Sequence, residues 1–184
     1  MAAYGLTRSG AAAVPMLLGG LDRADASLAV RIIDVLGDMG PRAASAAETI
    51  ATYANHAEPT VRRYALEALG LVISHNAEID QTFRDTLSAG LVDEDAIARR
   101  DATFAIARLG ERANNPETVQ RVTDNLYHWH HHVRGWSIEA LLRFQDPQAT
   151  KAALNYLSSA RWDESPKSGD RPPTSATLQS RSSE

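Results

Sequence analysis

The sequence predicts an all-α protein, an α-solenoid in which about four helical hairpins stack between a half-repeat at each end. Three observations predict this fold. The chain repeats itself every 33 to 37 residues, the apolar residues of each repeat follow helical spacing, and the core-forming residues are aliphatic. Apolar residues make up 43% of the 184 residues but aromatic residues only 6%, which favours closely packed helices over a β-sandwich.

Four 13-residue windows carry the repeat and align without gaps: residues 28–40, 61–73, 98–110 and 133–145. In each window the first, fifth, eighth, ninth and twelfth residues are apolar or small, the spacing of a helix with one face on a core. The spacing therefore predicts one helix per window. It also makes the ninth residues equivalent and buried, namely Leu36, Leu69, Ile106 and Leu141.

A second helical segment precedes each window and forms a hairpin with it. Short polar stretches such as NHAEPT and DEDAI separate the two segments and predict the turns. These first helices are predicted at residues 11–21, 43–54, 79–91 and 116–126, and a fifth at residues 148–160 closes the array. Because one such pair cannot bury its apolar face alone, neighbouring pairs must stack.

The stretch VRRYALEALG nearly matches the V-R-x-x-A-x-x-A-L-G pattern of short HEAT-like repeats, and ARRDATFAIARLG and VRGWSIEALL are clear variants of it. The chain thus resembles the HEAT-like repeat family, whose members include bilin-lyase-type repeats, over residues 2–160. The resemblance implies a right-handed solenoid with a concave inner face. It does not fix a function, because such repeats occur in scaffolds, lyases and repair enzymes alike.

Both ends of the chain differ from the repeats. The stretch AAYGLTRSG matches only the second half of a window. We therefore expect the C-terminal part of a larger protein, an N-terminal end covered by a partner, or a short self-contained N-terminal helix. The stretch ATKAALNYLSSARW is similar to the ends of HEAT-repeat segments appended to bacterial enzymes, such as proteins of the phytanoyl-CoA dioxygenase family. We assign residues 1–162 to the solenoid and predict that the Ser- and Pro-rich residues 163–184 form a disordered tail.

Composition and missing motifs exclude several classes of function. The absence of Cys excludes disulfides, thiolate nucleophiles and Cys-based metal sites, and the net charge of −4 argues against a nucleic-acid backbone as ligand. No apolar stretch reaches the roughly 20 residues of a membrane span. Neither a nucleotide-binding glycine loop nor a nucleophile elbow occurs. We therefore expect a cytoplasmic protein that needs no cofactor and binds neither nucleic acid nor membrane.

The stretch YHWHHHVRGW offers one set of candidate metal ligands. On a helix, His128 and His132 would share one face, which is half of a metal site, but no third ligand follows from the spacing. The repeat offers another interpretation, because His130 occupies the turn position that Asp25, Glu58 and Asp95 hold elsewhere. We predict no metal site and interpret the His run as a variant of the turn.

Charged residues at the third and seventh window positions share one helix face. The acids Asp34, Glu67 and Glu139 form a column there, and Arg63 and Arg100 lie beside it. The column is similar to the acidic ladder of HEAT-like deoxyhypusine hydroxylases, but the His-Glu dipeptides that bind their iron are absent. The simpler expectation is an ion pair within one helix, such as Arg63 with Glu67.

The resemblance places this face on the inner side of the solenoid. We predict a non-catalytic scaffold or accessory subunit that binds a partner protein there, because aromatic and Arg side chains anchor most interfaces. The predicted contact residues are Arg63, Tyr64, Glu67, Arg100, Phe104, Trp136 and Glu139. The alternative is a subunit of an enzyme with a composite active site, like a bilin lyase or the partner of an oxygenase, and a more remote one is a HEAT-like DNA glycosylase.

Overall fold

The structure, a computed structural model, describes residues 10–76 and 79–159. Every regular element within these residues is a helix, which confirms the all-α prediction. The helices that follow the hairpin turns are α3 (Ala26–Met39), α5 (Pro59–Val72), α7 (Ala96–Leu109) and α9 (His131–Arg143). The helices that precede the turns, together with the closing helix, are α2 (Val14–Leu21), α4 (Ala47–Tyr53), α6 (Gln81–Gly90), α8 (Pro116–Asp124) and α10 (Pro147–Ser159).

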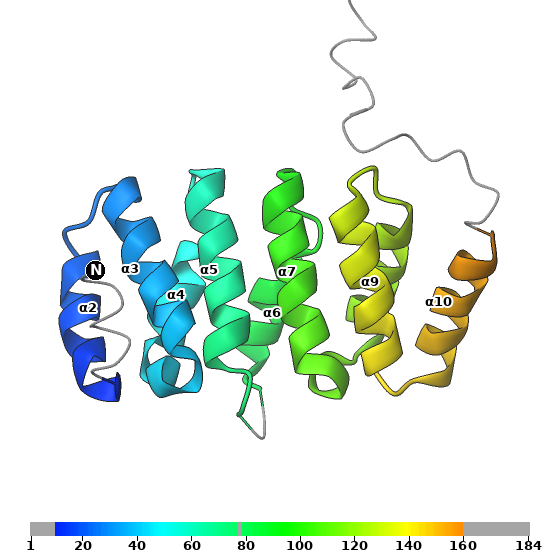
Figure 1. Cartoon of the computed structure of the whole chain (residues 1–184), viewed down its shortest axis with the longest axis horizontal. Coiled ribbons are helices and arrows are strands. Elements are labelled where there is room, and N and C mark those ends of the chain that lie inside the picture. The colour runs from blue at the N-terminus through cyan, green and yellow to red at the C-terminus, as the bar shows by residue number, and fades with distance from the viewer. Residues whose placement is uncertain (1–9, 77–78, 160–184) are drawn as a thin grey trace, which may run out of the picture.

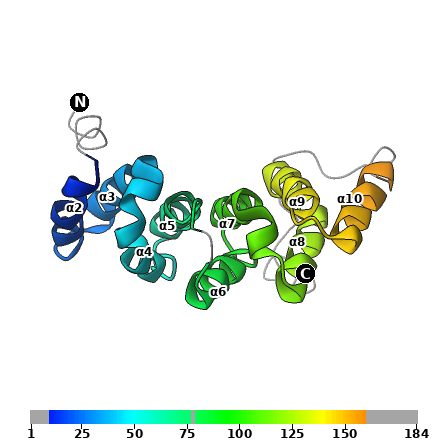
Figure 2. The same ribbon diagram turned by 90° about the horizontal axis from the view of Figure 1, so that it is seen from below.

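The helices form two rows that lie against each other. Helices α3, α5, α7 and α9 stand side by side in chain order, with α2 and α10 at the two ends (Figure 1). Seen along the helices, α4, α6 and α8 form the second row (Figure 2). We call α3, α5, α7 and α9 the second-helix row and the others the first-helix row. In the second-helix row each helix packs on the next along its length.

The four helices of the second-helix row begin at the same position of the repeat. Each predicted window starts three residues after the N-cap, and the N-caps are Asp25, Glu58, Asp95 and His130. The Asp25 carboxylate accepts a hydrogen bond from the Leu28 amide (2.8 Å), and the Asp95 carboxylate accepts from the first turn of α7. The structure thus confirms His130 as the turn residue of its repeat.

The core lies between the two rows and along the second-helix row. The predicted equivalents Leu36, Leu69, Ile106 and Leu141 are all buried, which confirms the register of the windows. Gly70 lies inside α5, where a Cβ atom would stand 2.7 Å from the Cα atom of Ala105. Only a residue without a side chain therefore allows α5 and α7 to approach this closely.

The first-helix row is shorter than the sequence predicts. Residues 43–54 were expected to form one helix, but a 3-10 segment (Gly40–Ala46) precedes α4. Gly40 has a φ of +56°, which ends α3, and Pro41 follows it at the start of the 3-10 segment. Likewise α6 begins after Asp80, whose carboxylate accepts a hydrogen bond from the Thr82 amide (2.7 Å).

Some predictions lie outside the described residues. These are the half-window near residues 2–10, except for its last residue, and the disordered tail at residues 163–184. Three further 3-10 segments complete the described elements, at Gly10–Ala13, Gly110–Ala113 and Asn125–Tyr127. Within residues 10–76 and 79–159 no helix has both the length and the apolar character needed to cross a bilayer.

Candidate functional site

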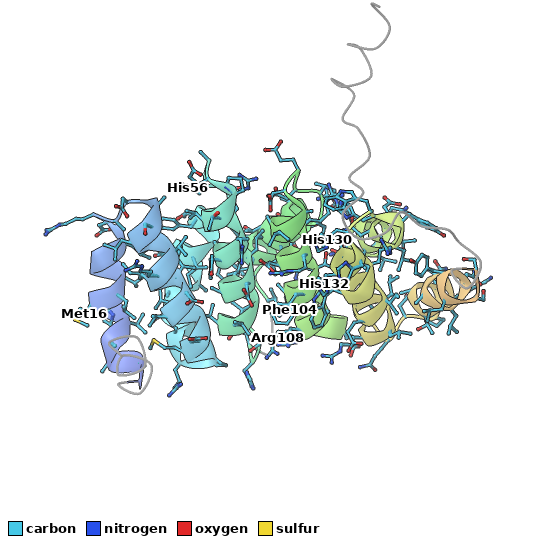
Figure 3. All side chains as sticks on the ribbon, turned by 45° about the horizontal axis from the view of Figure 1, so that its top comes forward. Met16, His56, Phe104, Arg108, His130 and His132 are labelled. Atoms are coloured by element: carbon cyan, nitrogen blue, oxygen red, sulfur yellow. The ribbon has the colours of Figure 1, made fainter. Side chains whose placement is uncertain are left out.

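The predicted contact residues lie on three neighbouring helices, and all of them are half-buried. We call this surface the central face; it consists of Arg63, Tyr64 and Glu67 on α5, Arg100 and Phe104 on α7, and Trp136 and Glu139 on α9. Because α5 packs on α7 and α7 on α9, the fold brings the three helix stripes together. Figure 3 shows Phe104 and Arg108 on the same side of the molecule as His130 and His132.

The central face contains an aromatic pair that joins two helices. The ring of Phe104 meets the ring of Trp136 edge to face, with 4.9 Å between the ring centroids. The guanidinium of Arg108 lies 5.8 Å from the centre of the Phe104 ring. Tyr64 holds the same window position as Trp136, but its ring carries the guanidinium of Arg63 at 4.9 Å. The two equivalent aromatic residues therefore have different contacts.

A buried aspartate at the centre of the face was missed by the sequence analysis. Asp101 on α7 occupies the window position of Tyr64 and Trp136, and its side chain is only 3% exposed. Arg100 donates a hydrogen bond from Nε to Oδ1 of Asp101 (2.7 Å). From α5, the Nε atom of Arg63 stands 3.8 Å from Oδ2, which is too far for a hydrogen bond.

The Asp101 carboxylate is poorly compensated for its burial. Its Oδ2 atom and the Nε atom of Arg63 are both buried without a hydrogen-bond partner among the described residues. Burial raises the pKa of Asp101 to about 6, and the negative charge of Glu67 adds to the rise, while Arg100 and Arg63 oppose it. An unsatisfied buried acceptor costs about 1–3 kcal/mol, so this group lowers the stability of the fold.

The next arginine along α5 makes the opposite kind of ion pair. Arg62 donates to both carboxylate oxygens of Asp93, from Nε and from Nη2, at 2.8 Å each. Its Nη1 atom also donates to the carbonyl oxygens of His56 and Ala57. Burial alone would raise the pKa of Asp93, but the hydrogen bonds from Arg62 and from the Asp95 amide lower it below its ordinary value. This pair is a satisfied bidentate ion pair.

The Arg62 contacts recur in the later repeats. Arg99 holds the equivalent window position in α7 and donates to the carbonyl oxygen of Asp93 (2.9 Å). Arg134 holds it in α9 and donates to the carbonyl oxygens of His128 and Trp129 at 2.8 Å each. We call Arg62, Arg99 and Arg134 the arginine ladder. Each of them ties the hairpin turn of its own repeat to the helix that follows.

The His cluster takes part in the same turns. His128 lies before the start of α9 and shares no helix with His132, so the i, i+4 arrangement that would make half a metal site does not form. The Nδ1 atom of His128 accepts a hydrogen bond from the His130 amide (3.1 Å), as His56 does from the Glu58 amide (3.0 Å). Burial, with the nearby positive charge of Arg99, lowers the pKa of His128 to about 4.

The acid column does not form a ligand ladder. Glu139 accepts a hydrogen bond from Nε of Arg143 (2.6 Å) within α9, and Asp34 stands exposed on α3. Arg63 pairs with Asp101 across the helices rather than with Glu67, so the expected ion pair within α5 is absent from the described contacts. Nowhere in residues 10–76 and 79–159 do three His, Asp or Glu side chains gather in a way that suits a metal ion.

Comparison with known proteins adds no assignment. No protein-family model matches the chain, and no curated protein sequence matches it. The function must therefore be argued from the geometry of the central face and of Asp101 beneath it.

Proposed function

We propose that this chain is a right-handed HEAT-like α-solenoid that binds a partner protein through the central face. The register of the windows supports the solenoid. Equivalent positions of the repeats supply the N-cap, the buried ninth residue and, in three repeats, the ladder arginine. In this arrangement the second-helix row forms the concave inner side. A scaffold of this kind presents one continuous row of helices to its partner.

The buried carboxylate of Asp101 is the observation that carries the proposal. The fold gains little from a buried carboxylate with one oxygen unsatisfied. Groups that a protein retains at a cost to stability cluster where it binds or reacts. The costly group, Asp101 on α7, lies in the middle of the central face, between Arg63 of α5 and the Phe104–Trp136 pair.

The composition of the face supports a protein partner rather than a small molecule. Phe104, Trp136 and Arg100 are half-buried, so a partner can cover them without first ordering long, mobile side chains. Interface cores are enriched in aromatic and Arg side chains and depleted of Lys, and this face has no Lys.

Site-specific cross-linking tests the proposal. A benzophenone amino acid replaces Arg108, which is exposed on α7 beside Phe104, and the matched control replaces Gln120, which is exposed on α8 of the first-helix row. After irradiation in lysate of the source cells, we expect one defined adduct from position 108 and none from position 120. Adducts of equal yield from both positions, or from position 120 alone, would contradict binding at the central face.

A composite active site is the second candidate, because a buried carboxyl group with a raised pKa suits acid–base chemistry. The variant Asp101→Asn separates the two functions once the partner is captured. A scaffold keeps its partner, and the complex keeps any activity that the partner brings. In a composite enzyme, the variant still binds the partner but loses activity. The activity of the unaltered complex then depends on the protonation of one group between about pH 5 and pH 7.

A further inference from the structure

We infer that the guanidinium groups of Arg63 and Arg100, held over the buried carboxylate of Asp101, form a recognition site for a Glu or Asp side chain in an acidic segment of the partner. The inference rests on the proposed function and names the chemistry of the partner. It commits the central face to an acidic ligand, although the whole chain carries a formal net charge of −4.

The two guanidinium groups stand on neighbouring helices at the same window position. Both side chains remain partly accessible, Arg63 at 33% and Arg100 at 27%, whereas Asp101 below them is almost closed off at 3%. The visible surface at this point is therefore that of the two arginines and not that of the acid. A guanidinium offers several donors in one plane, and a carboxylate accepts two of them side by side.

Arg63 has unused hydrogen-bonding capacity. Among the described residues it donates no hydrogen bond, its distance to Asp101 is 3.8 Å, and it rests on the Tyr64 ring. Arg62, its neighbour in the chain, uses its guanidinium on four acceptor atoms. The contrast makes Arg63 the guanidinium on α5 that can still take up an anionic group.

The charges around Asp101 decide how the site responds to pH. From α5 it faces Arg63 and Glu67, and on α7 its neighbour Arg100. Burial lowers the pKa of His130, the N-cap of α9, and the positive charges of His131, His132 and Arg100 lower it further. When Asp101 takes up a proton, the two guanidinium groups lose the negative charge that they share.

Proton uptake by Asp101 should therefore strengthen the binding of an acidic segment. An isolated Glu side chain has a pKa near 4.3, and neighbouring carboxylates raise that value in poly-glutamate. Any protonation of the ligand removes negative charge and weakens its binding, so it opposes the trend expected from Asp101. Since the pKa of Asp101 is about 6, binding should tighten as the pH falls from 7.5 to 5.5. Neutralising one charge a few ångströms from the bound carboxylate, in a partly buried site, should change the affinity roughly tenfold.

The probe is a fluorescein-labelled poly-L-glutamate peptide, with poly-L-glutamine and poly-L-lysine peptides of the same length as references. Fluorescence anisotropy at low salt should detect binding of poly-glutamate alone. Arg63→Gln should weaken it at least roughly fivefold, because it removes one of the two cations. Arg23→Gln, which removes the same charge from the exposed turn before α3, should change it less than about twofold. Equal losses from both variants would overturn the site.

Asp101→Asn isolates the carboxylate from the His cluster. This variant should bind poly-glutamate at pH 7.5 as tightly as the unaltered chain does at pH 5.5, and its affinity should change little between these two values. A pH dependence that persists unchanged in Asp101→Asn would assign the effect to His130, His131 and His132 and overturn this part of the inference. Circular dichroism of each variant confirms that it folds.

The cross-linking experiment separates the inference from the proposed function. A specific adduct from position 108 together with no effect of Arg63→Gln on partner capture means that the face binds a partner whose chemistry is not acidic, which overturns only the inference. The absence of any specific adduct at position 108 overturns the proposed function as well.

Discussion

Arg62 and Arg63 are adjacent in the chain, and each faces an aspartate of the next repeat, but the two pairs differ in almost every physical respect. Arg62 holds Asp93 by two hydrogen bonds of 2.8 Å at the turns of the hairpins. Arg63 stands 3.8 Å from Asp101 on the central face. The pKa of Asp93 is lowered, and that of Asp101 is raised to about 6.

The difference shows which charges the fold needs. Arg62 belongs to the arginine ladder, which recurs in three repeats and satisfies carbonyl groups that the turns leave without partners. Asp101 occurs in one repeat, at a position where two others carry aromatic rings, and it leaves an acceptor unsatisfied. The ladder therefore serves stability, and Asp101 makes the binding that we propose depend on pH.

The largest expected effect on stability comes from breaking the Arg62–Asp93 pair. Asp93→Ala removes two hydrogen bonds from Arg62 and one from the Asp95 amide, and it leaves a largely buried guanidinium unpaired. We expect it to lower the free energy of unfolding by about 3 kcal/mol in urea denaturation. Glu94→Ala is the control, because Glu94 is 90% exposed and 3.9 Å from Arg62, and it should cost less than about 0.5 kcal/mol. Equal losses of stability in Asp93→Ala and Glu94→Ala would contradict a structural role for the Arg62–Asp93 pair.

Exchanging the two arginines for lysine sharpens the comparison. Arg62→Lys cannot reproduce a bidentate pair together with two carbonyl contacts, so we expect a loss of about 2 kcal/mol. Arg63→Lys keeps the charge and gives up no hydrogen bond, so the loss should stay below about 0.5 kcal/mol. Thermal unfolding of the two variants under identical conditions measures the difference. A costlier change at Arg63 would mean that its pair with Asp101 is structural.

The pH dependence of the stability of Asp101→Asn tests the Arg63–Asp101 pair. Because the folded chain binds the Asp101 proton more tightly than the unfolded chain, this group makes the free energy of unfolding rise as the pH falls from about 6 to 4. Asparagine does not titrate, so the variant should exceed the unaltered chain by roughly 1–2 kcal/mol at pH 8, with the gap closing by about pH 4.

His128 acts in the opposite direction but does not disturb this test. Its pKa is lowered to about 4, so its contribution to stability is lost as the pH falls from about 6.5 towards 4. That contribution is common to both proteins and cancels in their difference. A variant that is less stable than the unaltered chain at pH 8 would contradict a costly carboxylate at position 101.

The smallest expected effect comes from Glu67→Gln. This change removes the negative charge that helps to raise the pKa of Asp101, so that pKa should fall. Glu67 makes no ion pair among the described contacts, and the free energy of unfolding should change by less than about 0.5 kcal/mol. Poly-glutamate should also bind more tightly, because a repelling charge has gone. Weaker binding would mean that Glu67 contacts the ligand directly.

More of the fold than of the site could be predicted from the sequence, because four repeats give the same helical pattern even where one of them departs from it. Four windows with one apolar pattern located the second helices to within a few residues. The short α4 could not be predicted as well, since Gly40 and Pro41 favour a 3-10 segment that the Ala-rich sequence after them does not reveal. Asp101 lies outside this apolar pattern, at the fourth window position, where the other windows carry Arg31, Tyr64 and Trp136.

The central face illustrates the same limit. Helical spacing placed all seven predicted residues on three helices that pack together, but it could not show which pairs meet across helices. The sequence shows that Tyr64 and Trp136 share a window position, and the spacing predicted an ion pair between Arg63 and Glu67. In the structure Trp136 meets Phe104 and Arg63 turns towards Asp101, because packing between helices outweighs contacts within one. An acid at a window position that holds aromatic rings in two of the other three windows was the signal that would have found Asp101.

Titration of the aspartate carboxyl carbons by NMR tests the distinction between the two pairs most directly. In one sample, the Asp101 carboxyl should titrate near pH 6, and the Asp93 carboxyl should titrate below the ordinary pKa of an aspartate. Arg63→Gln should move the Asp101 titration to still higher pH, since it removes a stabilising positive charge. If both carboxyl groups titrate below pH 4 in the unaltered chain, Asp101 is as well satisfied as Asp93, and the central face loses the observation on which its proposed function rests.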